Sequence, residues 1–152
     1  MFSASPEAKL KVTDSNQTGR SVDDGIVYTC SYGAKFFYYG GKPGELAIYL
    51  DADSAQVETT LIKNLTQIIV TYLPATDANP PKVAISTTGE GGWINLTPTN
   101  FLSTAKIYNV PSVGDYYIRI RRNGTTNTYI KAVEYCRLDL SACPNCFIYR
   151  PE

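Results

Sequence analysis

The sequence predicts an all-β fold, an antiparallel two-sheet β-sandwich of jelly-roll-like type with about ten short strands. Short segments rich in β-branched and aromatic residues recur along the chain, separated by turns that contain Gly, Pro, Asn and Asp. No segment shows the long 3.6-residue period of a helix, which excludes alternating strand–helix units. We expect residues 1–152 to form a single β-sandwich domain.

The first half of the chain contains five expected strands. They are expected at residues 9–13, 26–30, 34–39, 45–50 and 51–64. Polar or glycine-containing segments predict a loop at 14–24 and turns at 31–33 and 40–44. The segment 51–64 also has the spacing of a short helix, but Thr59 and Thr60 favour an extended chain.

The second half is expected to continue the pattern as far as Tyr135. Strands are expected at residues 65–73, 82–86, 93–96 and 104–110, followed by a hairpin from Gly114 to Tyr135. Glycine-rich residues 87–92 predict a turn, and residues 98–103 predict a loop. Pro111 is expected to end the strand at 104–110, because proline cannot donate to a ladder.

The hairpin between Gly114 and Tyr135 has the clearest strand pattern. Asn123 and Gly124 tolerate the positive φ of a tight hairpin turn. Alternation places Tyr116, Ile118 and Ile120 on the core face and Tyr117, Arg119 and Arg121 on the opposite face. The alternation breaks after Tyr129, which predicts either a bulge or a strand covered on both faces.

The composition excludes several functional classes. Fourteen basic and 14 acidic residues give a formal net charge of zero, which argues against nucleic acid and anionic lipid as partners. The absence of histidine excludes His-based triads and His-containing zinc sites. No apolar run approaches the roughly 20 residues that a membrane helix needs, so we expect no membrane insertion. No cofactor is expected.

The N-terminal residues lack the apolar core of a secretory signal. Two interpretations follow: an export signal has been removed from the chain, or the chain is made without one. The expected location is therefore extracellular or at the cell surface, or alternatively in a virion.

Four cysteines are candidates for disulfide bonds. They are Cys30, Cys136, Cys143 and Cys146. A Cys30–Cys136 bridge would join the ends of an early strand and the last one. Free buried thiols, a metal site and redox chemistry remain as alternatives, although a single C-x-x-C pair is a weak zinc or redox motif.

Aromatic and basic side chains supply the candidate ligand-binding residues, Trp93, Tyr117, Arg119 and Arg121. A flat ring can stack on the apolar face of a sugar while nearby polar groups bind its hydroxyls. The alternative for Trp93 is packing at one end of the core. For the arginine pair, the alternatives are a solvated face or an assembly contact.

The sequence gives little support for catalysis. The acidic residues Asp23, Asp24, Asp51, Asp53 and Glu58 could include a pair of catalytic carboxylates, but they equally fit turns and surfaces. Asp51 and Asp53 could also ligate calcium through oxygen atoms. We predict no catalytic residues and no metal site.

Four segments resemble secreted β-sandwich modules of gut Bacteroidota, in the galactose-binding or carbohydrate-binding jelly-roll group. They are residues 68–72, 86–93, 114–121 and 129–135. The resemblance implies a non-catalytic module and places a ligand at Trp93, Tyr117, Arg119 and Arg121. Phages of the same hosts carry similar sandwiches.

Two functions are therefore expected. The first is glycan binding through surface aromatics. The alternative is a structural protein of a phage virion or surface assembly, such as a capsid decoration, fibre or tail subunit. Its partners would be other protein subunits, and a homo-oligomer also fits.

Overall fold

A computed structural model describes residues 4–9, 18–20, 26–38, 46–73, 79–102, 105–125 and 127–138. The elements in these ranges are the strands β1 (Ala4–Lys9), β2 (Thr18–Arg20), β3 (Val27–Ser31), β4 (Lys35–Tyr38), β5 (Leu46–Leu50), β6 (Gln56–Thr59), β7 (Ile62–Leu73), β8 (Lys82–Ser86), β9 (Ile94–Asn95), β10 (Pro98–Leu102), β11 (Ala105–Arg121) and β12 (Thr128–Leu138). Their pairings are antiparallel, so the predicted all-β, antiparallel fold class is confirmed. The described part of the chain contains no helix suited to crossing a membrane.

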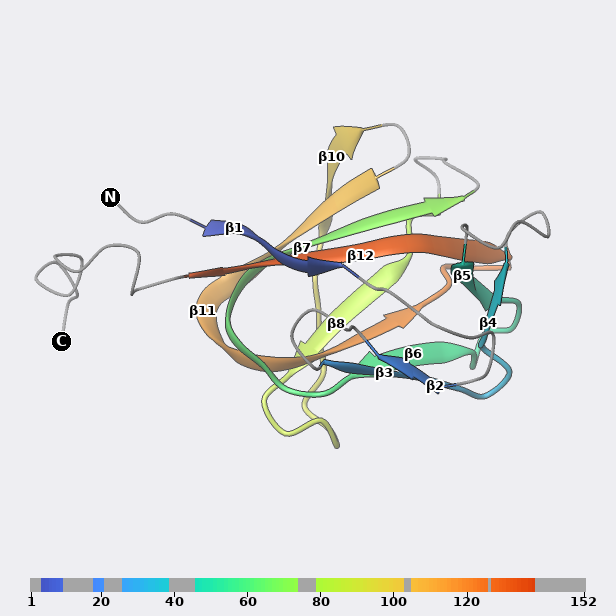
Figure 1. Ribbon diagram of the computed structural model, residues 1–152, viewed down its shortest axis with the longest axis horizontal. Coiled ribbons are helices and arrows are strands. Elements are labelled where there is room, and N and C mark those ends of the chain that lie inside the picture. The colour runs from blue at the N-terminus through green and yellow to red at the C-terminus, as the bar shows by residue number, and fades with distance from the viewer. Residues whose placement is uncertain are drawn as a thin grey trace, which may run out of the picture.

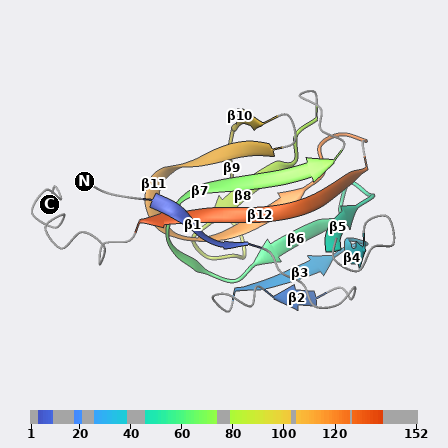
Figure 2. The same cartoon turned by 45° about the horizontal axis from the view of Figure 1, so that its top comes forward.

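The strands form two sheets that face each other (Figures 1 and 2). In sheet A the order is β10, the first part of β11, β7, β12, β5 and β4, and β1 also pairs with β12. In sheet B the order is β2, β3, β6, the last part of β11, β8 and β9. The sheets are continuous through β11, which Figure 1 shows bending from one layer into the other.

β11 changes sheets near its middle. It pairs with β7 from Ala105 to Asn109 and again at Gly114 and Tyr116, and from Tyr117 it pairs with β8. The ladder with β7 is interrupted between Asn109 and Gly114, and Pro111 lies in this interruption. The prediction that Pro111 ends the strand is therefore wrong, because proline removes no ladder bond where β7 is not paired.

The predicted hairpin is also wrong. β11 pairs with β6, β7, β8 and β10, whereas β12 pairs with β1, β5 and β7. Gly124 has the expected positive φ of 70°, but its turn carries the chain from sheet B to sheet A instead of closing a hairpin. Asn123 is not among the residues with positive φ, so the expected two-residue hairpin turn, which needs positive φ at both Asn123 and Gly124, is not formed.

The predicted core face of the last part of β11 is confirmed, and the second strand is irregular as expected. Ile118 and Ile120 are fully buried, while the alternate positions on β11 are partly exposed. On β12 the register shifts between Ile130 and Ala132, so the bulge, one of the two alternatives for the broken alternation, is the one that the structure shows.

Other strand boundaries differ from the prediction. β2 lies inside the expected loop 14–24, and β10 occupies most of the expected loop 98–103. The first strand is β1 rather than 9–13, and residues 10–13 lie outside the described ranges. The segment 51–64 divides into β6 and the start of β7. The short strands β2 and β10 are extended because β3 and β11 offer backbone partners, which no local pattern reveals.

The chain also forms more strands than the expected ten or so, and three of them are long. β7, β11 and β12 contain 12, 17 and 11 residues. Since β7 pairs with both β11 and β12, these three strands form the middle of sheet A.

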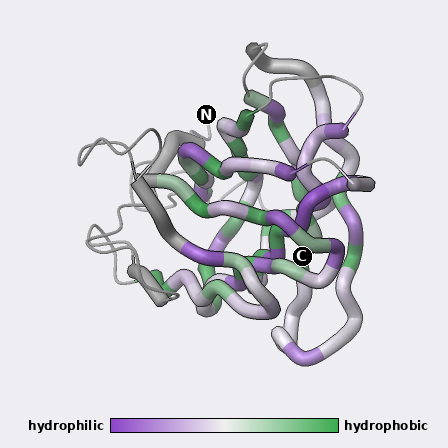
Figure 3. Tube along the Cα trace, turned by 90° about the vertical axis from the view of Figure 1, so that its right-hand side faces the viewer, coloured by the Kyte–Doolittle hydropathy of each residue, from purple (hydrophilic) through white to green (hydrophobic). Residues whose placement is uncertain are grey.

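One main hydrophobic core fills the space between the sheets. Its largest fully buried side chains include four tyrosines, namely Tyr28, Tyr72, Tyr108 and Tyr135. Hydrophobic and hydrophilic residues alternate along many strands, as the green and purple bands of Figure 3 show. Burial of each large apolar side chain stabilises the fold by about 1.5–3 kcal/mol.

The predicted Cys30–Cys136 disulfide is wrong. Cys30 enters the main core from β3 in sheet B and keeps a free thiol, whose pKa is raised to about 12 by burial. Cys136 lies on β12 in sheet A, in a separate small cluster, and its Sγ donates a hydrogen bond to Gln67 Oε1 at 3.6 Å. The two thiols thus belong to different clusters. Cys143 and Cys146 lie outside the described residues.

Candidate binding face

Strand alternation gives sheet B a face that points away from the core. On β11, Ile118 and Ile120 enter the core, so Tyr117, Arg119 and Arg121 point outward. We call the following residues the outer face of sheet B: Gln56, Glu58, Lys82, Ala84, Ser86, Trp93, Asn95, Tyr117, Arg119 and Arg121.

The strand register arranges this face in rows. Arg119 lies opposite Glu58 on β6 and opposite Ala84 on β8, and Ala84 in turn lies opposite Asn95 on β9. In the next row, Arg121 lies between Gln56 and Lys82. Tyr117 lies opposite Ser86.

Arg119 and Trp93 form the centre of this face. The guanidinium carbon of Arg119 lies 4.4 Å from the centroid of the Trp93 ring, which is cation–π geometry. The pKa of Arg119 is lowered, first by burial and then by the positive charge of Arg121, while Glu58 acts in the opposite direction. Arg119 remains charged at neutral pH, as arginines in proteins do. Because Trp93 is only partly buried, part of its side chain is open to solvent.

A buried serine holds the turn that precedes Trp93. Ser86 Oγ accepts hydrogen bonds from the backbone N–H groups of Thr88 and Gly89, at 3.1 and 3.0 Å, and donates one to the carbonyl of Gly91. Gly89 has a φ of +76°, and a Cβ at this residue would lie 3.1 Å from ring atoms of Tyr117. The turn therefore packs directly on the Tyr117 ring.

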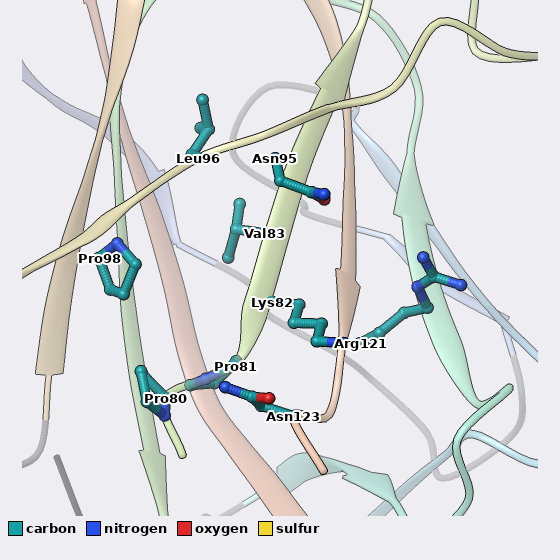
Figure 4. Close-up of a pocket in the computed structure, with 9 residues that line it drawn as sticks. All are labelled: Pro80, Pro81, Lys82, Val83, Asn95, Leu96, Pro98, Arg121 and Asn123. Carbon is teal, nitrogen blue, oxygen red and sulfur yellow. The ribbon is translucent and has the colours of Figure 1, made fainter. Parts of the chain in front are cut away.

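A hollow of about 230 Å³ lies at the edge of sheet B beside this face (Figure 4). Its lining residues are Pro80, Pro81, Lys82, Val83, Asn95, Leu96, Pro98, Arg121 and Asn123. In Figure 4, apolar side chains such as Pro98 and Leu96 lie on one side, and Lys82 and Arg121 lie on the other. The hollow therefore combines an apolar wall with two cations.

All four predicted binding residues lie on the outer face of sheet B. The structure brings Trp93 and Arg119 into contact, places Tyr117 under the glycine-rich turn, and places Arg121 at the hollow. Sequence reasoning missed Ser86, Lys82 and Asn95. Ser86 could have been found as a small polar residue directly before a glycine-rich turn, whereas Lys82 and Asn95 depend on strand pairing.

The acidic residues do not form a cluster. Glu58 is the one carboxylate among the described residues of the outer face, and Asp53 forms an ion pair with Arg122 at 3.0 Å. Asp51 is exposed just after β5, and Asp23 and Asp24 lie outside the described residues. Within the described ranges, no group of three or more acidic or cysteine side chains could hold a metal ion.

No protein-family model and no curated protein matches the chain. Among solved structures, the chain is similar to the CBM22-1 xylan-binding domain of Xyn10C from Paenibacillus barcinonensis. The TM-score is 0.48 at 8% identity, over 91% of this chain and 97% of that chain. A similarity at this level shows neither a family nor a ligand for this chain.

Proposed function

We propose that this chain is a non-catalytic β-sandwich module that binds glycans on the outer face of sheet B. The observation that carries the proposal is the Trp93–Arg119 pair, a partly exposed ring held at 4.4 Å by a cation. An aromatic ring held in place beside polar side chains suits a sugar, which presents apolar C–H faces and hydroxyl groups.

The groups around Trp93 suit hydroxyl recognition. Arg119 offers several N–H donors, and the side chains of Glu58 and Asn95, in the same cross-strand row, add acceptors and a donor. The row lies on strands of one sheet, which hold its members at fixed spacing. Ser86 fixes the turn before Trp93, so little conformational entropy is lost when a ligand binds.

Binding without catalysis is proposed because the face lacks a carboxylate pair. Glycoside hydrolysis by the usual route needs two carboxyl groups across the scissile bond. The described outer-face residues contribute only Glu58, and its register partners are Arg119 on β11 and Thr29 on β3.

Location and assembly remain predictions. The proposed function fits an extracellular or cell-surface module, and it also fits the surface of a virion. Exposed apolar side chains that could serve protein contacts lie on separate elements: Tyr32 after β3, Ile94 on β9 and Val113 in the bend of β11. No observation favours the structural virion subunit as a second function.

Substitution of Trp93 tests the proposal. Trp93→Ala is expected to weaken retention on glycans by about tenfold, because the stacking surface is lost. Trp93→Phe keeps a ring and should retain part of the affinity. Val113→Ala removes an exposed apolar side chain elsewhere and should bind like the wild type.

The measurement is a glycan array followed by titration calorimetry on the oligosaccharides that bind, with melting temperatures to verify folding. Wild-type protein that retains no glycan would contradict the proposal. Equal affinity of the wild type and Trp93→Ala would contradict it as well.

A further inference from the structure

We infer that the hollow at the edge of sheet B binds the acidic group of an anionic oligosaccharide, a carboxylate or a sulfate ester, between Lys82 and Arg121. This inference rests on the proposed function, because it names the class of glycan that the same face would bind.

The first argument is an unbalanced pair of cations. The register places Arg121 of β11 directly opposite Lys82 of β8, and Cβ atoms in such pairs are only about 5 Å apart. Like charges in this position repel and destabilise a sheet. An anion bound between the two side chains would turn this repulsion into two attractions.

The surrounding described residues do not supply that anion. None of the residues that line the hollow is acidic. Asp53 borders a neighbouring hollow together with Lys82, but its carboxylate forms an ion pair with Arg122. Within the described ranges, the side chains of Lys82 and Arg121 form no hydrogen bond or ion pair. Both cations are therefore available to a ligand.

The two cations also suit the chemistry of the proposed group. A guanidinium presents parallel N–H donors that match the two oxygens of a carboxylate or the oxygens of a sulfate. The ammonium group of Lys82 adds a second positive charge with rotatable donors. Arg121 is partly buried, so solvent screens its charge less than that of a fully exposed arginine.

The walls of the hollow indicate a saccharide rather than a free ion. Pro98 and Leu96 supply an apolar side, while Asn95 and Asn123 supply amide donors and acceptors. The volume of about 230 Å³ is below the roughly 300–1,000 Å³ of pockets for drug-sized ligands. It suits one sugar unit whose chain continues outside.

The hollow is held in shape by hydrogen bonds. The Tyr108 hydroxyl donates from the core to the carbonyl of Pro81, and the Leu96 N–H donates to the carbonyl of Val83 at 2.8 Å. Pro80 and Pro81 restrict the backbone further, because their φ angles are fixed by the ring. A site with this support needs little reorganisation on binding.

The hollow is continuous with the Trp93 site. Arg119 and Arg121 are two residues apart on one strand face, a spacing of about 7 Å. Asn95 belongs to the Arg119 row and also lines the hollow. One oligosaccharide could therefore stack on Trp93 and place an acidic unit between Lys82 and Arg121.

Titration calorimetry with four probes tests the inference. The probes are oligogalacturonate, its neutral methyl ester, a sulfated galactan oligosaccharide and polyglutamate. The variants are Lys82→Gln, Arg121→Gln and, as a control for loss of one exposed lysine elsewhere, Lys63→Gln on β7. Melting temperatures verify that each variant is folded, and the exposed position of Lys82 makes its variant the safer of the two.

The wild type is expected to bind at least one acidic oligosaccharide about tenfold or more tightly than the methyl ester. Lys82→Gln and Arg121→Gln should each lose about tenfold in affinity for it and should lose much less affinity for the methyl ester, because the neutral ester carries no charge for the lost cation to bind. Lys63→Gln should bind like the wild type. The acidic oligosaccharide that binds more tightly identifies the anion as carboxylate or sulfate.

Failure of the inference differs from failure of the proposed function. Equal binding of acidic and neutral oligosaccharides, or unchanged affinity in Lys82→Gln and Arg121→Gln, would overturn the inference alone, and Trp93→Ala would still weaken binding of all saccharides. Polyglutamate binding as tight as that of the acidic saccharides would overturn the assignment to glycans at this hollow. Absence of binding to every saccharide would overturn both.

Discussion

Trp93 is positioned by residues that contact the turn before it. Ser86 accepts hydrogen bonds from two backbone N–H groups of the turn, and Gly89 packs on the ring of Tyr117. The Arg119 guanidinium lies over the Trp93 ring itself. The candidate site therefore depends on small residues as much as on the aromatic ones.

Three glycines of this turn form a matched series. A Cβ at Gly89 would meet the Tyr117 ring at 3.1 Å, and its φ is +76°. Gly92 has a φ of +65° but open space around it, and Gly91 has open space without a positive φ. Positive φ costs a non-glycine residue of order 1 kcal/mol.

We therefore expect Gly89→Ala to lower the free energy of unfolding most, by about 2 kcal/mol from strain and the ring contact together. Gly92→Ala should lower it by about 1 kcal/mol, and Gly91→Ala should have little effect. Urea unfolding at constant pH measures all three. Equal losses for Gly89→Ala and Gly92→Ala would show that the Tyr117 contact contributes nothing.

At the scale of elements, β11 organises the fold because it belongs to both sheets. Its first part pairs with β7 and β10, and its last part pairs with β6 and β8. Where the strand enters sheet B, the N–H of Ile118 donates a hydrogen bond to Thr59 Oγ1 at 3.0 Å. This buried bond connects β6 to β11 just before their ladder begins at Arg119.

Thr59→Val should destabilise the protein by about 1–3 kcal/mol, because it keeps the shape of the side chain but leaves the buried Ile118 N–H without its acceptor. Thr29→Val on the neighbouring strand β3 is the matched control, since Thr29 is exposed, and its effect should stay within about 0.5 kcal/mol. Equal unfolding free energies for the two variants in urea would contradict the role given to Thr59.

At the scale of the whole molecule, the main core is shared by both sheets. Cys30 and Val57 enter it from sheet B, and Ile68 and Val133 enter it from sheet A. When one sheet unfolds, the core residues of the other sheet therefore lose their packing partners. The single-domain assignment remains a prediction, and this shared core is the reason to expect cooperative unfolding.

Two probes can test this cooperativity. Trp93 is the one tryptophan of the chain and lies on the outer face of sheet B, whereas far-UV circular dichroism reports all the strands. We expect their urea transitions to coincide within error, because β11 and the shared core couple the two sheets. A separate, earlier Trp93 transition would show that sheet B unfolds on its own.

The sequence by itself determined the fold class, the core face of the last part of β11 and four side chains of the candidate face, namely Trp93, Tyr117, Arg119 and Arg121. Period-2 alternation identified Ile118 and Ile120 as core residues, and the broken alternation after Tyr129 indicated an irregularity, for which a bulge was one of two interpretations. These features are local, since successive side chains on a strand point to opposite sides whatever its neighbours are.

The tertiary structure alone decided which strands are neighbours. β11 and β12 follow each other along the chain, yet β11 ends in sheet B and β12 lies in sheet A. Likewise, Cys30 and Cys136 lie in different clusters. The same pairing brought Lys82 beside Arg121 and gave the hollow its charge. Backbone hydrogen bonds can form between any two extended segments that lie side by side. Packing of the whole chain, and not the local pattern of either strand, therefore decides which strands pair.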